Sequence, residues 1–314
     1  MISVSEIRHR LPDAFLDAID ERYSPLTVDQ ILLGLSGERD TTLRVNTLRA
    51  DVREVMRLFQ KKNIKFVRVP WCRDALDLKN ADERTIQKLP IYQEGGVYLQ
   101  SLSSMLPPLA LAPKPGERVL DLTAAPGSKT TQMAAMMENR GFLLANELDK
   151  IRCERLRYNL EVQGVTIATV CTGAGEKVGQ AHPAEFDRVL LDAPCSGEGR
   201  FLANKSITYR NWSERTVQQC ARVQRRLLQS ACQALKPGGI LVYSTCTLNL
   251  TENEQVLDWA LQSLPLEMLD LDLQVPGSRP AFAAGYRPAV GKALRILPSR
   301  TMEGFFVSKL RKRR

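Results

Sequence analysis

The feature of this sequence that most constrains its fold is a series of short apolar segments that alternate with helical patterns beyond residue 117. The apolar segments lie at residues 118–123, 141–148, 166–172, 186–194 and 238–246. Strands that read as nearly continuous apolar runs are buried on both faces, and helices between such strands are the connections that parallel strands require. The sequence therefore predicts an α/β fold built on a doubly wound parallel sheet.

The first third of the chain has a different pattern. Apolar residues spaced by three and four predict helices within residues 12–35, and residues 42–71 read as strand, helix and strand. We therefore expect a smaller helical and α+β module over residues 1–106. The doubly wound domain would then occupy residues 107–314, with its final strand at residues 303–310.

Composition excludes several classes of protein. The hydrophobic content of 44% is ordinary for a soluble protein, and no apolar run approaches the roughly 20 residues that cross a bilayer. The start of the sequence lacks the order of a signal peptide, so we expect a cytoplasmic protein that does not interact with membranes. Seven cysteines without a CxxC pair, together with two histidines, argue against a metal site and predict free thiols.

Charge favours an acidic partner. The 44 Lys and Arg residues exceed the 35 Asp and Glu residues, which gives a net charge of +9. The segment Arg200–Arg226 is rich in basic residues, with Phe201, Tyr209 and Trp212 between them. Basic side chains neutralise phosphates and aromatic rings stack on unpaired bases, so this segment is a candidate nucleic-acid surface. The alternative, the solvated face of an amphipathic helix at 213–235, is equally compatible with the pattern.

Ligands of doubly wound sheets bind beyond the carboxyl ends of the strands, where this sequence has distinctive residues. "DLTAAPGSKT" at 121–130 ends the first strand in a tight turn whose backbone can approach a ligand closely. The turn lacks the glycine spacing of a P-loop or of a dinucleotide site. Glu147, at the end of the second strand, can accept hydrogen bonds from two ribose hydroxyls, although an acid beside a helix start is also a common structural feature.

Two cysteines follow two other strands of the same sheet. Asp192, Pro194 and Cys195 form a rigid turn after the fourth strand, and Cys246 ends the fifth. A thiol beside a planar base suits cytosine, because carbon 5 of that base is a poor nucleophile until a thiolate adds to carbon 6. A lone cysteine at a strand end is more often inert packing, and we expect this of the other five cysteines.

Several segments together resemble the RNA cytosine-C5 methyltransferases of the NSUN/RsmB/RsmF family. They are "DLTAAPGSKT", "LANELDKIR", "LLDAPCSGEG" and "YSTCTLNLTENE", and "LRVNTL" resembles the RNA-recognition-like N-terminal module of that family. The resemblance covers about residues 40–310 and is closest to the RsmF members, although we expect their C-terminal extension to be missing here. It implies a Rossmann-like class I methyltransferase sheet, the cofactor S-adenosylmethionine and an RNA partner, either rRNA or tRNA. We expect a monomer.

The resemblance also assigns roles to individual residues. It implies that Cys246 attacks the cytosine, that Cys195 aids release of the product, and that Asp192 and Lys129 lie at the target base. The residues that it implies for cofactor binding are Thr123, Ala124, Ala125, Pro126, Gly127, Ser128, Lys129, Glu147, Thr172 and Asp192. Thr172 stands where the family usually has an aspartate near the adenine, so one charge-assisted contact would be missing.

Two other functions stay open. A non-catalytic RNA-binding or ribosome-assembly factor could retain the fold, as the replaced aspartate would allow, whereas the intact thiol pair argues against it. Action on DNA is the second alternative, and the cysteine after Thr245 favours RNA. We also interpret Thr251 and Glu254 as a capping box at the start of a helix.

Overall fold

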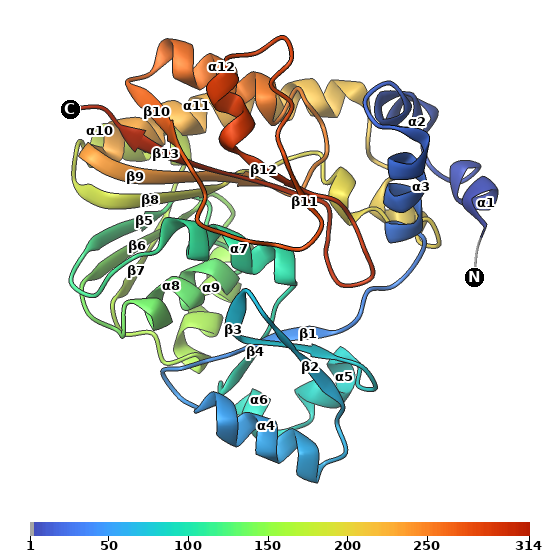
Figure 1. The fold of residues 1–314 in the computed structure, drawn as a ribbon. Helices are drawn as coiled ribbons and strands as arrows, with labels where there is room; N and C mark the ends of the chain where they lie inside the picture. The colour runs from blue at the N-terminus through green and yellow to red at the C-terminus, as the bar shows by residue number, and fades with distance from the viewer. Residues whose placement is uncertain (1–2) are drawn as a thin grey trace.

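The computed structural model describes residues 3–314, which form a large α/β domain with a small four-stranded module beside it (Figure 1). The large sheet has nine strands in the order β11-β12-β13-β9-β8-β5-β6-β7, with β10 paired to β13. Its parallel part consists of β5 (Arg118–Asp121), β6 (Phe142–Glu147), β7 (Ala168–Thr172), β8 (Phe186–Asp192) and β9 (Leu235–Thr245). The doubly wound parallel sheet predicted from the sequence is therefore confirmed.

Helices cover both faces of this sheet because consecutive strand residues point to opposite sides. Leu190 packs with one apolar cluster, and its neighbour Leu191 packs with the other. The first face is covered by α7 (Leu102–Leu111), α8 (Ser128–Met136) and α9 (Lys150–Val162), and the second by α10 (Gly175–Ala181), α11 (Glu214–Ala234) and α12 (Glu254–Ser263). The predicted boundary between residues 106 and 107 falls inside α7, which packs on the large sheet.

The last strand joins the middle of the sheet. β13 (Phe305–Lys312) runs antiparallel to β9 on one side and to β12 (Leu294–Ile296) on the other, and β10 (Leu266–Leu269) and β11 (Ser278–Pro280) complete the sheet. Phe306 pairs with Thr245, whereas Arg311 pairs with Ile240. The basic C-terminal residues therefore lie about 17 Å along the sheet from the end that carries the second cysteine.

The small module contains the predicted β1 (Thr42–Val45), α4 (Val52–Lys61) and β2 (Phe66–Val69), with the additional β3 (Cys72–Leu78), β4 (Val97–Leu99), α5 (Glu83–Gln87) and α6 (Pro90–Gln93). Its strand order is β2-β3-β1-β4. Buried Arg44 joins the module to the large domain: its Nε donates to Gln100 Oε1 (3.0 Å) and its Nη2 donates to Thr131 Oγ1 of α8 (3.0 Å).

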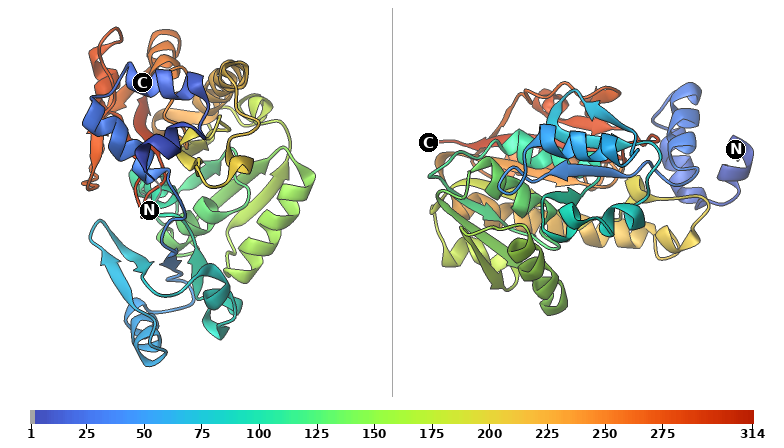
Figure 2. Two further views of the ribbon diagram at one scale, coloured as in Figure 1. Left: turned by 90° about the vertical axis from the view of Figure 1, so that its right-hand side faces the viewer. Right: turned by 90° about the horizontal axis from the view of Figure 1, so that it is seen from below.

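The first three helices pack away from this module. They are α1 (Val4–Arg8), α2 (Asp13–Asp20) and α3 (Pro25–Gly34), and they lie against the large domain (Figure 2). Phe201 is fully buried among them, with its ring 5.2 Å from that of Phe15 and 6.3 Å from that of Trp212. Phe201 therefore belongs to the core and cannot stack on a base, and the amphipathic helix expected after it is present as α11. Among residues 3–314, no helix is both long and apolar enough to cross a membrane.

Candidate active site

A cavity of about 690 Å³ opens at the carboxyl ends of the parallel strands. The predicted site residues in its wall are Thr123, Ala124, Ala125, Pro126, Ser128, Lys129, Glu147, Asp192, Cys195 and Cys246. Segments that are far apart in the sequence thus meet at one site, as expected for the switch edge of a doubly wound sheet. Of the predicted residues, Gly127 and Thr172 lie outside the wall.

The loop after β5 is fixed to the strands on both sides. Ala124 donates its N–H to the carbonyl of Asn146 (2.8 Å), and Thr123 Oγ1 donates to the carbonyl of Asp192 (2.8 Å). Gly127 precedes α8 with a φ of +108°, and a Cβ at this position would lie 3.0 Å from Leu156 Cδ1. Glycine is therefore needed for the backbone conformation and for the close packing of the loop on α9.

Glu147 has one carboxylate oxygen without a donor. Its Oε1 accepts hydrogen bonds from the N–H groups of Leu148 (2.9 Å) and Asp149 (3.0 Å). Its Oε2 is buried and accepts no hydrogen bond, although Arg152 Nη1 lies 3.3 Å away. Because buried polar atoms are normally hydrogen-bonded, an oxygen of this kind in a cavity wall suits a ligand that brings hydroxyl donors.

Asp121 is a site residue to which the sequence assigned no role. It is buried at the end of β5, lines the cavity and accepts a hydrogen bond from Thr130 Oγ1 (2.7 Å), whereas its Oδ1 has no partner. Burial raises the pKa of Asp121 to about 7. A carboxyl as the last residue of a buried strand is the signal that could have identified it.

Lys129 and Asp192 form an ion pair in the cavity wall. Lys129 Nζ lies 2.7 Å from Asp192 Oδ2 and also donates to Ser104 Oγ (2.7 Å). Asp192 Oδ1 accepts from Ser244 Oγ (2.7 Å), so both oxygens of this carboxylate have partners. The two residues predicted to lie at the base are thus held together by contacts with neighbouring elements.

The two thiols are in direct contact. Cys195 Sγ and Cys246 Sγ are 3.2 Å apart. The pKa of Cys246 is lowered by a hydrogen bond from Cys195 and by the nearby guanidinium of Arg200, and the same thiol contact raises the pKa of Cys195. This arrangement favours a Cys246 thiolate that accepts a hydrogen bond from a neutral Cys195. A thiolate is the nucleophilic form of cysteine.

Thr172 lies at the exposed end of β7, where its Oγ1 donates to Cys153 Sγ (3.2 Å). Gly175 and Glu176, just after it, line the cavity instead. A contact between Thr172 and an adenine stays a prediction. The sequence pattern does not indicate Glu176 as a site residue, because an acid in the first turn of a helix carries no distinctive signal.

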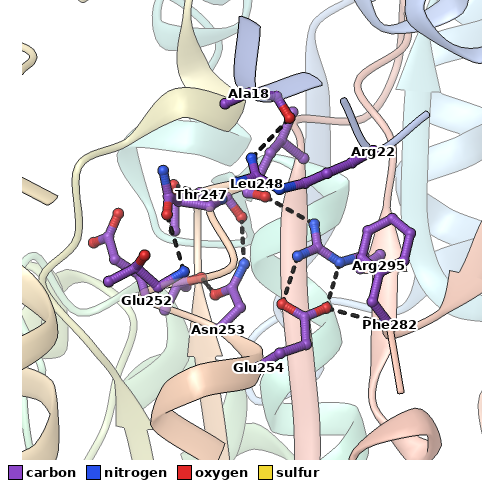
Figure 3. A network of polar contacts seen from close by, with 12 residues as sticks. Ala18, Arg22, Thr247, Leu248, Glu252, Asn253, Glu254, Phe282 and Arg295 are labelled. Atoms are coloured by element: carbon purple, nitrogen blue, oxygen red, sulfur yellow. Dashed lines mark hydrogen bonds and ion pairs between the residues drawn. The ribbon is translucent and has the colours of Figure 1, made fainter. Parts of the chain in front are cut away.

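The predicted capping box of Thr251 and Glu254 is wrong. Glu254 does begin α12, but the preceding residue, Asn253, makes no side-chain cap. Glu254 is fully buried, and its carboxylate accepts from Nε and Nη2 of Arg295 (both 2.6 Å), as Figure 3 shows. A buried guanidinium needs a carboxylate partner, and that requirement decides the position of Glu254.

Models of two protein families match the chain. One, described as 16S rRNA methyltransferase RsmB/F, matches residues 108–311. The other, described as the N-terminal domain of 16S rRNA methyltransferase RsmF, matches residues 11–102. Proteins named ribosomal RNA small subunit methyltransferase F from Cronobacter sakazakii and Citrobacter koseri are both 39% identical to the chain. Each match covers 96% of this chain and 63% of the relative, so the chain spans less than two thirds of their length.

Solved structures are also similar. A methyltransferase homolog protein from Pyrococcus horikoshii has a TM-score of 0.80 at 34% identity, covering 96% of this chain and all of that chain. NSun6 from Pyrococcus horikoshii, solved with SFG, has a TM-score of 0.85 at 21% identity, covering 97% of this chain and 99% of that chain. These likenesses confirm the Rossmann-like class I methyltransferase fold that the sequence predicts. In residues 3–314, no three His, Cys, Asp or Glu side chains come together as metal ligands would.

Proposed function

Because the chain belongs to the RsmB/F family of 16S rRNA methyltransferases, we propose that it transfers a methyl group from S-adenosylmethionine to carbon 5 of a cytosine in RNA. The observation that carries this proposal is the contact between Cys195 and Cys246 at 3.2 Å in the wall of the cavity. The names of the curated relatives favour rRNA of the small subunit over tRNA as the substrate. A cytoplasmic location and a monomeric state stay predictions.

The residues of the cavity fit the cofactor. Its volume of about 690 Å³ is in the range of small-molecule sites, and the unpartnered Oε2 of Glu147 can accept from ribose hydroxyls. The loop at 123–127 brings backbone close to the ligand, and Asp192 borders it. When bound, S-adenosylmethionine would supply an electrophilic methyl group, and breaking its bond to that methyl group would leave S-adenosylhomocysteine.

Cys246 reacts with the cytosine in two stages, addition to carbon 6 and later elimination. The Cys246 thiolate attacks carbon 6, so that an S–C6 bond forms and the displaced electron pair of the C5–C6 double bond takes the methyl group at carbon 5. A base then removes the proton from carbon 5, the double bond re-forms, and the S–C6 bond breaks to return the thiolate. Cys195, in contact with Cys246, assists this release, and the Lys129–Asp192 pair offers donors and acceptors to the polar edge of the base.

A non-catalytic RNA-binding or ribosome-assembly factor is the alternative function. Such a protein would need neither a thiolate-stabilising Arg200 nor a second thiol at Cys195. Action on DNA is the other alternative, and comparing methylation of RNA and DNA oligonucleotides of one sequence tests it.

The roles of the two thiols can be separated with single variants. Cys246→Ala should lose methyl transfer to small-subunit rRNA transcribed in vitro while still binding RNA, because nothing then activates carbon 5. Cys195→Ala should instead accumulate a protein–RNA adduct that survives a denaturing gel and depends on S-adenosylmethionine, because attack proceeds and release is impaired. The double variant should form none.

Cys171→Ala, which changes a thiol in β7 outside the cavity, serves as the matched control and should behave as the wild type. RNA with 5-azacytidine at the target has no proton on ring position 5, so it should trap the wild type through Cys246. An adduct formed by Cys246→Ala, or a trapped peptide that maps to Cys195, would reverse the assignment. No methyl transfer by the wild type on any RNA would favour the non-catalytic alternative.

A further inference from the structure

Glu252 makes a contact that its place in the sequence does not suggest. It follows Cys246 by six residues, yet its carboxylate binds the loop of the other thiol. Its Oε2 accepts from the N–H of Ser196 (2.9 Å), its Oε1 accepts from Ser196 Oγ, and Ser196 directly follows Cys195. Glu252 is fully buried, so solvent does not compete for these hydrogen bonds.

A second contact joins the loop that follows Cys195 to the turn that follows Cys246. Ser196 Oγ and Thr247 Oγ1 are 2.9 Å apart, and Thr247 directly follows Cys246. The residues that follow the two thiols are thus hydrogen-bonded to each other, as the thiols themselves are in contact. On α11, Gln224 Nε2 donates both to Glu252 Oε2 (3.0 Å) and to the carbonyl of Pro194 (2.9 Å). Both chain neighbours of Cys195 are therefore tied to Glu252, directly or through Gln224.

The residues after Glu252 fix it on the side of Cys246. Asn253 Oδ1 accepts from Thr245 Oγ1 (2.6 Å) and its Nδ2 donates to the carbonyl of Thr247 (3.0 Å), so it holds both neighbours of Cys246. Figure 3 shows Asn253 directed at this turn and Glu254 directed at Arg295, whereas the side chain of Glu252 extends away from that ion pair. Three consecutive side chains thus hold the turn after Cys246: Glu252 contacts the loop of Cys195, Asn253 contacts both neighbours of Cys246, and Glu254 contacts Arg295.

We propose that Glu252 is a positioning residue of the methyl-transfer site, which sets the separation of Cys195 and Cys246 through Ser196 and Thr247 and thereby the rate at which methylated RNA is released. This inference rests on the proposed function of the two thiols. Ser196, Thr247 and Glu252 lie behind the cavity wall and not in it, so they act through the cysteines. Burial raises the pKa of Glu252 to about 7. Burying a carboxyl costs free energy that an apolar side chain would not, so packing alone does not explain a glutamate at this position.

The separation of the thiols can be measured without substrate. Diamide oxidises neighbouring thiols to a disulfide, and mass spectrometry of peptides gives the rate of Cys195–Cys246 bond formation. Glu252→Ala and the nearly isosteric Thr247→Val should each slow this rate about tenfold or more, whereas Thr247→Ser and Glu252→Gln should restore most of it. The matched control is Ser230→Ala, which removes a buried hydroxyl that bonds Gly175 and Gly179 near the C-terminal end of α11.

The same variants are then assayed with RNA and S-adenosylmethionine. Glu252→Ala and Thr247→Val should lower kcat about tenfold or more, leave the KM for S-adenosylmethionine within twofold, and accumulate the adduct expected of Cys195→Ala. Wild-type oxidation rates in both variants would overturn the proposal, and so would equal slowing in Ser230→Ala, which would indicate general loosening. If Glu252→Ala does not fold, Thr247→Val decides alone. Because oxidation needs no substrate, failure of the proposed function would appear separately, as a wild type without methyl transfer.

Discussion

Glu147 offers the most direct test of the cofactor site. Its Oε1 accepts from two backbone N–H groups, whereas its buried Oε2, 3.3 Å from Arg152 Nη1, accepts no hydrogen bond. In Glu147→Gln, the amide oxygen can keep the backbone contacts while the NH2 group takes the place of Oε2. The variant therefore keeps the shape of the side chain and loses one acceptor, together with its charge.

The size of the effect follows from the hydrogen bond that the variant loses. A hydrogen bond to a charged group contributes about 1.5–3 kcal/mol. At about 1.4 kcal/mol per tenfold change, losing one such bond raises the Kd for S-adenosylmethionine about 10- to 150-fold. Loss of two such contacts would exceed this range.

Calorimetric titration of the purified protein with S-adenosylmethionine measures the Kd, and circular dichroism checks that the variant is folded. The matched control is Glu154→Gln on the exposed side of α9, where the carboxylate pairs with Arg157 at the surface, and its Kd should equal that of the wild type. A folded Glu147→Gln protein with a Kd within about twofold of the wild type would refute the assignment of Glu147 to the cofactor.

Two further predictions concern residues at neighbouring strand ends. The pKa of Asp121 is raised from its ordinary 3.8 to about 7, so its protonated form stabilises the fold; this contribution is complete below about pH 4 and is lost as the pH rises through 7. In urea titrations, the free energy of unfolding of Asp121→Asn should therefore fall less steeply between pH 4 and 7 than that of the wild type. An equal slope in the two proteins would contradict the raised pKa. Thr172→Asp should bind S-adenosylmethionine equally or more tightly in the same calorimetric assay, because a charged acceptor is added near the expected adenine position. A large loss of affinity would mean that the end of β7 does not contact the cofactor in the way the resemblance implies.

The parallel sheet could be predicted because its signal is local. Each buried strand is a short apolar run, and each turn at its carboxyl end carries polar residues such as Glu147 or Asp192. The position of those turns at one edge follows from the topology alone. The pattern therefore indicated most of the residues that line the cavity, although Gly127 and Thr172 lie outside its wall and Asp121 and Glu176, which line it, were missed.

Contacts that depend on distant partners could not be predicted in this way. Glu254 reads as a capping residue until Arg295, 41 positions later, is known to be buried beside it. Glu252 has no local feature that indicates Ser196, and Phe201 looks like a base-stacking residue until the first helices of the chain cover it. In each case a long-range requirement for burial or charge pairing overrides the local pattern.

The central place of β13 has a consequence for how the protein matures. In the order of synthesis this strand follows every other strand of the sheet, yet β9, which Cys246 directly follows, has β13 as its neighbour on one side. While the chain is being translated, β9 presents an open edge until residues 305–312 emerge, and such an edge is a template for pairing with foreign strands. Cys246 thus acquires its finished surroundings only after this segment has been synthesised and has paired with β9.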